Sequence, residues 1–300
     1  KIRDFPIRKQ WVPAEMMNVE LVKGIAEAGS IKRYIRSRKW ETATPSAEDI
    51  EKQLRRIRHK YDFCFWAFFC ITIDAKLGGR VRFRLNYPQL VTLSRCEAMR
   101  KAGSPIDIII LKARQWGGST FCIFYQTWIA FKWDPYHSFV VAAHVQSASE
   151  TIQAMLKGTL SSYPAWDLGL PEDTTLELGR RGTTNNAWVL KNGAHEQVWP
   201  SVFYIGSAEK PDTLRSSNVH GAHYSEVGIW PDTPQKRPED LISDISGGMT
   251  KRALDMQVME STAKSSDDYF HEMWTGAMKG ESSYSCVFIP WFFIPHDSVG

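Results

Sequence analysis

The sequence predicts an α/β fold whose mostly parallel sheet is flanked by helices, with a small helical region at the N-terminus. From residue 106 onward, short apolar segments alternate with longer segments of helical character, which is the pattern of βαβ units. Glycine, proline and asparagine turns separate these segments. The chain has 300 residues, and 43% of them are hydrophobic, which is enough to build a substantial core.

The predicted elements after residue 60 follow one another with short connections. A half-exposed strand at 78–86 precedes a helix at 87–103. Strands are then expected at 106–113, 137–144, 219–230, 255–264 and 284–295, and helices at 119–132, 147–160, 239–249 and 266–280. Three short strands at 174–179, 187–193 and 196–206 predict a hairpin inserted on the sheet.

Residues 1–60 are predicted to form a separate, basic helical region, a lid or a partner-contact surface, with residues 61–300 as the main domain. This region holds fifteen Lys or Arg side chains against eight acids, although the whole chain has a net charge of only +4. Such an arm is typical of contact with a polyanion, and a solvated helix face is the alternative.

Composition also bounds the class of protein. The sequence has no run of 18 or more uncharged apolar residues, so we expect no membrane span. Residues 1–25 do not resemble a signal peptide. The five cysteines are scattered without a CxxC pair, which favours reduced thiols inside a cell. The chain begins at Lys1, so we interpret it as a fragment.

The stretch "IDIIILKARQWGGSTFCIFYQ" has the outline of a phosphate-binding loop that lacks its usual lysine. The pattern GxxxxGK[ST] requires lysine at the position of Gly118 and glycine at that of Lys112. Gly117 and Gly118 still let backbone N–H groups approach an oxygen closely. Ser119 or Thr120 offers a hydroxyl for Mg²⁺. The alternative is a strand–helix turn with incidental glycines.

Two further strand ends carry polar side chains. In "GAHYSEVGIW", Ser225 and Glu226 stand where phosphate-loop ATPases have Asp-Glu, so Glu226 is the candidate general base. Ser225 could hydrogen-bond a water of the metal but adds no charge. In "MESTAK", Ser261 and Thr262 could sense the γ-phosphate and couple hydrolysis to motion. His220 and His223 form an HxxH pair without an evident third ligand, so we expect them to be structural.

Residues 83–293 resemble the large subunit of tailed-phage terminases, the motor that packs double-stranded DNA into a procapsid. "KARQWGGST" is close to that family's loop, in which some members move the lysine to the front. "HYSE" matches a branch with serine before the catalytic glutamate, "ESTAK" matches the coupling motif, and "NYPQ" matches the adenine-contacting element.

The resemblance implies a phosphate-loop ATPase of the ASCE type that uses ATP and Mg²⁺ in the host cytoplasm. ATP-binding residues would be Lys112, Arg114, Gln115, Gly117, Gly118, Ser119, Thr120 and the base reader Gln89. Ser119 and Ser225 would hold the metal, Ser225 through water. Arg215 would complete a neighbouring subunit's site in a ring as an arginine finger.

Double-stranded DNA, a portal protein and a small terminase subunit are the implied partners, and Arg180 and Arg181 are candidate contacts to DNA phosphates. The family's nuclease is expected outside this chain. Two other functions remain open: a helicase-like nucleic-acid ATPase that needs no arginine in trans, and a nucleotide-binding module without hydrolysis.

Overall fold

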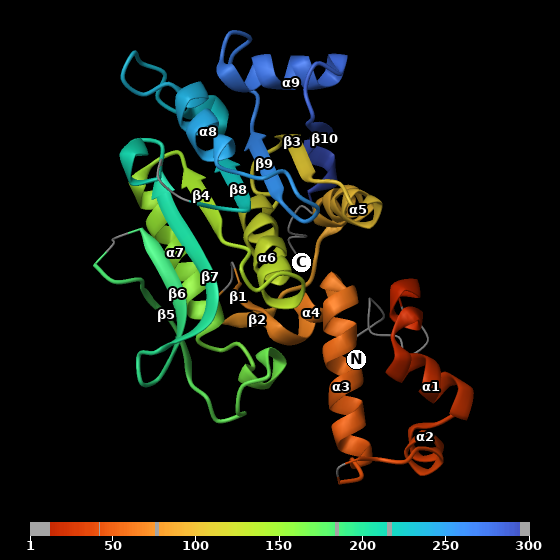
Figure 1. Ribbon diagram of the computed structural model, residues 1–300. Coiled ribbons are helices and arrows are strands. Elements are labelled where there is room, and N and C mark those ends of the chain that lie inside the picture. Colours follow the sequence, from red (N-terminus) through yellow and green to blue (C-terminus); the bar gives the residue numbers. More distant parts are fainter. Residues whose placement is uncertain (1–12, 42, 76–77, 184–185, 215–217, 295–300) are drawn as a thin grey trace. The chain divides into compact units, whose positions relative to one another are not determined.

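The computed structural model describes residues 13–41, 43–75, 78–183, 186–214 and 218–294 (Figure 1). The chain divides into two compact units. The first comprises Lys1–Thr72 and Arg82–Arg84, and the second comprises Ile73–Val81 and Leu85–Gly300. No helix of the described chain is both long and apolar enough to cross a lipid bilayer.

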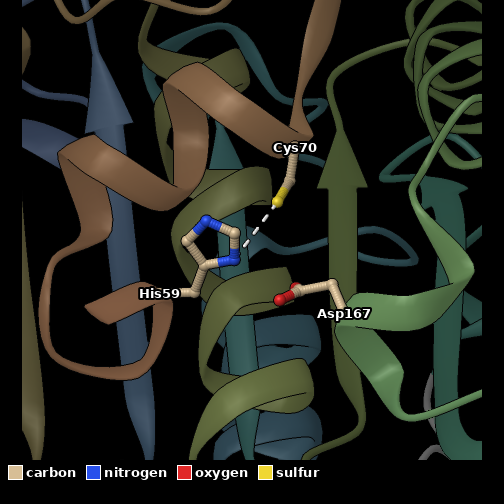
Figure 2. Close-up of side chains that lie close together, drawn as sticks. All are labelled: His59, Cys70 and Asp167. Carbon is tan, nitrogen blue, oxygen red and sulfur yellow. Dashed lines mark hydrogen bonds between the residues drawn. The ribbon is translucent and has the colours of Figure 1, made fainter. Parts of the chain in front are cut away.

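The first unit is helical. Its elements are the 3₁₀ helix η1 (Ala14–Asn18) and the helices α1 (Glu20–Ala28), α2 (Ile31–Ser37), α3 (Ala47–Tyr61) and α4 (Phe63–Cys70). A capping box between Ser46 and Asp49 starts α3, and the Asp62 side chain caps α4. Buried His59 and Cys70 face each other, with Nδ1 and Sγ 3.6 Å apart (Figure 2). A short hairpin of β1 (Thr72–Asp74) and β2 (Arg80–Arg82) follows.

The second unit is built on an eight-stranded sheet with the order β10-β3-β9-β8-β4-β7-β6-β5. Its strands are β3 (Ile106–Lys112), β4 (Phe139–Ala143), β5 (Leu176–Arg180), β6 (Ala187–Asn192), β7 (Gln197–Ser207), β8 (Gly221–Ser225), β9 (Met256–Ser261) and β10 (Ser285–Ile289). The six strands from β10 to β7 are parallel, and β6 and β5 add antiparallel pairs. The carboxyl ends of β3, β8 and β9 therefore meet at one edge of the sheet, where ligands of α/β proteins gather.

Helices cover both faces of this sheet (Figure 1). Its helices are α5 (Tyr87–Ala102), α6 (Gly118–Lys132), α7 (Gln146–Leu160), α8 (Pro238–Gly247) and α9 (Tyr269–Lys279), with short 3₁₀ turns η2 (Ala165–Leu168), η3 (Pro211–Thr213), η4 (Val227–Ile229) and η5 (Trp291–Phe293). Almost every residue of α6 is buried, so this helix is enclosed on all sides rather than amphipathic.

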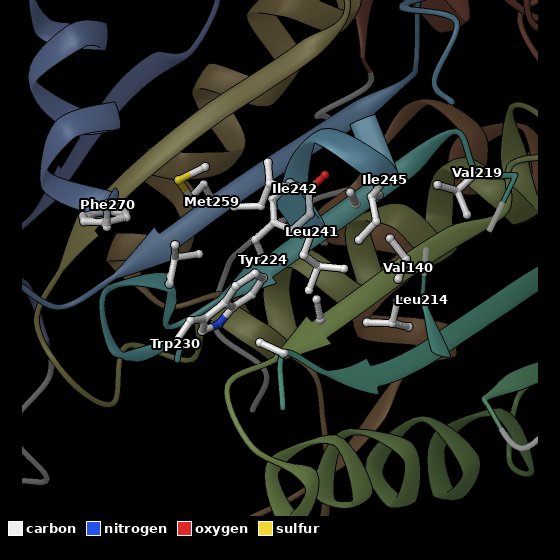
Figure 3. Close-up of a cluster of buried hydrophobic side chains, with 14 of the residues drawn as sticks. Val140, Leu214, Val219, Tyr224, Trp230, Leu241, Ile242, Ile245, Met259 and Phe270 are labelled. Carbon is white, nitrogen blue, oxygen red and sulfur yellow. The ribbon is translucent and has the colours of Figure 1, made fainter. Parts of the chain in front are cut away.

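The face under α8 and α9 carries a continuous apolar core (Figure 3). Tyr224 of β8 and Met259 of β9 lie beneath Leu241 and Ile245 of α8, and Phe270 of α9 extends the cluster. Because strand side chains alternate, Ser225 and Glu260, one residue after Tyr224 and Met259, point to the opposite face with α6.

The predicted fold class is confirmed: the unit is α/β, with a mostly parallel sheet and flanking helices. Three expectations need correction. The strand expected at 78–86 is shorter and spans Arg80–Arg82. The strand expected at 284–295 ends at Ile289 and gives way to η5. The three strands expected as an inserted hairpin do pair antiparallel with one another, but they extend the sheet itself, because β7 also pairs in parallel with β4.

Candidate functional site

The loop between β3 and α6 has the backbone geometry of an anion-binding turn. Gly117 (φ 77°) precedes the first helical residue, Gly118, and leaves the first N–H groups of α6 without helical partners. Gln115 also has a positive φ of 63°, an uncommon conformation for a side-chain-bearing residue. A Cβ on Gly118 would lie 2.2 Å from the ring of Trp116, so the position requires glycine.

Helix α5 holds this loop from one side. The Asn86 and Gln89 side chains cap the start of α5 reciprocally. Each also reaches the loop: Asn86 Nδ2 donates to the carbonyl of Trp116 at 3.0 Å, and Gln89 Nε2 donates to that of Gly117 at 2.9 Å. Gln89 is buried, and both polar atoms of its amide are engaged in the protein. In this structure Gln89 therefore positions the loop, and base reading stays a prediction.

Lys112 is the buried cation of the site. Its side chain is 5% exposed, and its Nζ pairs with Glu226 and lies 3.5 Å from Glu260 Oε2. Burial lowers the pKa of Lys112, but the charges of Glu260 and Glu226 outweigh that effect and raise it overall. Lys112 therefore remains charged and lies between the carboxylates of Glu226, which follows β8, and Glu260, near the end of β9.

Glu260 is the most enclosed acid of the site, with a side chain only 2% exposed. Its Oε1 lies 3.0 Å from Ser225 Oγ, 3.2 Å from His223 Nε2 and 3.4 Å from Ser119 Oγ. Burial raises its pKa, but the hydrogen bond from His223 and the charge of Lys112 overcome burial and lower the pKa to about 2. The carboxylate is therefore ionised at neutral pH.

Glu226 stands where β8 turns into η4. Its φ of 58° and ψ of 45° lie in the left-handed region, which costs energy for a residue with a side chain. Its side chain is 24% exposed, so it is paired with Lys112 yet open to solvent. A carboxylate held at a strand end beside an anion-binding turn is placed to act as a general base.

The remaining hydroxyl residues predicted for the site lie at the start of α6 and at the end of β9. Ser119 faces Glu260, whereas Thr120 Oγ1 lies 3.6 Å from the sulfur of Met155 and so contacts α7 instead. Ser261 Oγ accepts from Gly228 N at 3.0 Å, which ties the end of β9 to η4 directly after Glu226. Thr262 follows Ser261 immediately after β9 and is half-buried.

Other candidates lie outside this cluster. Arg114 is exposed in the turn after β3, where no contact to an acid is seen in the described chain. Arg180 and Arg181 are exposed at the end of β5, with the Arg180 guanidinium 5.7 Å from the ring centroid of Trp188. Arg215 lies outside the described residues.

Sequence reasoning missed three members of the site: Trp116, Glu260 and the role of His223. Glu260 is the one charged residue of the strand "MQVMES", and a buried acid in a central strand requires hydrogen-bonding or charged partners. That signal was available in the sequence. The partners were not, because they lie on four other segments: β3, the loop after it, α6 and β8.

The oxygen atoms gathered here suit Mg²⁺, which prefers hard oxygen ligands and keeps several of its waters. Two hydroxyls, Ser119 and Ser225, contact one ionised carboxylate, Glu260. The residues present therefore fit a magnesium ion bound through a hydroxyl and its own water shell.

Comparisons with known proteins identify similar folds. No family model and no curated protein matches the chain. Among solved structures, the large terminase ATPase domain of Thermus phage P74-26 is 15% identical, with 71% of this chain and 84% of that chain covered and a TM-score of 0.46.

The large terminase of another thermophilic bacteriophage is 12% identical over 69% of this chain and 46% of that one, with a TM-score of 0.47. The N-terminal domain of the DNA packaging ATPase of bacteriophage phi29 is 11% identical over 65% and 94%, with a TM-score of 0.41. These are the kinds of protein that the sequence motifs resemble. At such identities the likeness concerns the fold alone.

Proposed function

We propose that this chain is the ATPase domain of a viral DNA-packaging motor, which couples Mg²⁺-dependent ATP hydrolysis to the movement of double-stranded DNA. The observation that carries the proposal is the meeting of an anion-binding turn, a buried lysine and a strand-end glutamate at one edge of a parallel sheet. Phosphate binding and activation of water need those three groups within reach of one another.

Each group has a defined part in this reaction. The N–H groups around Gly117 and Gly118 bind phosphate oxygens. Glu226 orients the attacking water and accepts its proton. Magnesium, when bound, would neutralise charge on the β- and γ-phosphates, held by Ser119 and by Ser225 through water. Lys112, which also holds the Glu226 carboxylate, replaces the missing lysine of the loop as the cation for phosphate, and exposed Arg114 is the second cation available.

The coupling and assembly parts of the proposal come from the sequence motifs. Ser261 accepts a hydrogen bond from the backbone N–H of Gly228, two residues after Glu226, which supports a role for Ser261 and Thr262 in passing the nucleotide state to the rest of the domain. Arg215 would act on a neighbouring subunit in a ring. Double-stranded DNA, a portal protein and a small terminase subunit are the proposed partners, with Arg180 and Arg181 on DNA phosphates.

Steady-state ATP hydrolysis at increasing protein concentration, with and without double-stranded DNA, tests this function. Wild type, Glu226→Gln and Arg215→Ala should be compared alone and mixed. We expect both variants to lose turnover and their mixture to regain part of it, since each supplies the group that the other lacks. Arginine fingers and general bases each contribute factors of about 10²–10⁵.

Two results would count against the motor. If wild type binds nucleotide but turns over no faster than Glu226→Gln at any concentration, the site binds without hydrolysis. If Arg215→Ala retains full DNA-stimulated turnover as a monomer, the helicase-like function is favoured over a ring.

A further inference from the structure

The carboxylate that phosphate-loop ATPases place before their catalytic glutamate is missing from β8, where Ser225 occupies its position. The neighbouring strand supplies an acid at the same level of the sheet. β8 and β9 run in parallel, and their register pairs Ser225 with Glu260. Because paired residues of adjacent strands point to the same face, the two side chains lie side by side.

The contacts of Glu260 place its charge at the proposed metal position. Its Oε1 lies 3.0 Å from Ser225 Oγ and 3.4 Å from Ser119 Oγ, a hydroxyl in the first turn of α6. Its Oε2 faces Trp116 Nε1 at 3.3 Å and Lys112 Nζ at 3.5 Å. One oxygen is therefore turned toward the hydroxyls, and the other is held by the loop and the lysine.

The burial of Glu260 favours a function over a purely structural role. Taking a carboxylate out of water is costly, and an apolar side chain at such a position is often equally stable or more stable. Here the charge is kept by five polar neighbours on four different segments, including the phosphate-loop residues Trp116 and Ser119. A side chain that contacts the phosphate loop in this way is placed to act in the site.

We infer that Glu260 takes over the task of the missing acid on β8: its carboxylate, with Ser225 beside it, receives the hydrogen bonds of the metal's water shell. The inference rests on the proposed function and names a residue that the sequence motifs do not assign. The negative charge is then contributed by the strand that ends in Ser261, so the acid and the coupling serine are consecutive residues of β9.

Nucleotide affinity with and without the metal tests this role. Binding of ADP labelled with a fluorescent N-methylanthraniloyl group should be titrated in Mg²⁺ and in EDTA, and the ratio of the two dissociation constants gives the contribution of the metal. The EPR signal of free Mn²⁺ gives a second, direct measure of metal binding in the presence of ADP. Neither readout requires turnover.

Glu260→Gln should lose about tenfold or more of the affinity in Mg²⁺ and little in EDTA, which corresponds to about 1.4 kcal/mol or more. Moving the acid to β8 (Ser225→Asp with Glu260→Ser, the exchanged pair) should restore the metal dependence, because a carboxylate then stands on the adjacent strand at the paired position. Lys112→Met should weaken binding equally in both conditions. Asp107→Asn, a buried acid at the opposite end of β3 paired with Lys251, is the matched control and should leave the ratio unchanged.

The outcomes separate this inference from the function on which it rests. An equal ratio in wild type and Glu260→Gln would overturn the inference alone. Absence of nucleotide binding in wild type would overturn both. Metal-dependent binding that requires Glu260, without hydrolysis by wild type, would support the inference and overturn the proposed turnover. If thermal melting shows that Glu260→Gln is unfolded, the test depends on the exchanged pair instead. An exchanged pair that fails to fold, or that binds ADP without metal dependence, overturns the inference.

Discussion

The stability of the second unit should depend on pH through one histidine outside the site, His137. Its side chain is 0% exposed, and neither ring nitrogen has a hydrogen-bond partner among the described residues. Burial, and then the nearby His220 and Arg252, lower its pKa from 6.5 to about 3. The unfolded chain therefore binds a proton at pH 5 that the folded chain does not.

The sign and size of the effect follow from this difference. The folded pKa lies below the unfolded value, so His137 costs no stability above pH 6.5 and costs more as the pH falls toward 3. Each pH unit in that window is worth about 1.4 kcal/mol, which amounts to about 2 kcal/mol at pH 5. That is a large part of the 5–15 kcal/mol that holds a typical domain together.

Urea unfolding of wild type and His137→Leu, followed by circular dichroism between pH 7.5 and 4.5, measures this contribution. Leucine has a similar volume and no titrating group, so the variant should gain on wild type steadily below pH 6.5. His195→Asn, which removes an exposed imidazole, is the control for loss of one histidine. A difference between wild type and His137→Leu that stays constant across this range would refute the reasoning.

Three further predictions concern the phosphate loop. Lys112→Met should destabilise the second unit by about 3–5 kcal/mol, because it leaves two carboxylates without their buried cation, and the midpoint of urea unfolding checks this. Gly118→Ala should cost about 1–3 kcal/mol and abolish ADP binding, since its Cβ would overlap the Trp116 ring; a calorimetric titration that finds wild-type affinity would contradict it. Gln89→Ala should cost about 1 kcal/mol and weaken ATP and GTP binding equally if Gln89 only positions the loop, whereas a loss confined to ATP would show base reading.

The sequence predicted the elements of the second unit well because they alternate strongly between apolar strands and helices. β3 and α6 were found within one residue of their bounds, since an apolar run ends in a glycine turn there. The final strand was overextended because "PWFF" continues the apolar run, yet Pro290 cannot donate to a ladder and β10 stops before it.

Only some residues of the candidate site could be named from the sequence, because motifs depend on local sequence. Motifs identify residues near a glycine turn or a strand end, and so they found Lys112 and Glu226. They cannot show which face of β9 meets α6, and this decides that Glu260 rather than a residue of β8 lies against Ser119. Nor can they show that Gln89 lies under Gly117, because that contact joins the start of one helix to the start of the next.

The edge strand β10 has a mechanical consequence. Its last residue, Ile289, is in register with Lys112, and its carbonyl accepts from the N–H of Ala113, the first residue of the phosphate loop, at 2.9 Å. A pull on the chain beyond Ile289 would load the five paired residues of β10 and β3 in shear, so that their hydrogen bonds resist together rather than one by one. Tension would then reach the phosphate loop through β10 alone. A conformational change in the loop would be transmitted through β10 to the chain that follows it.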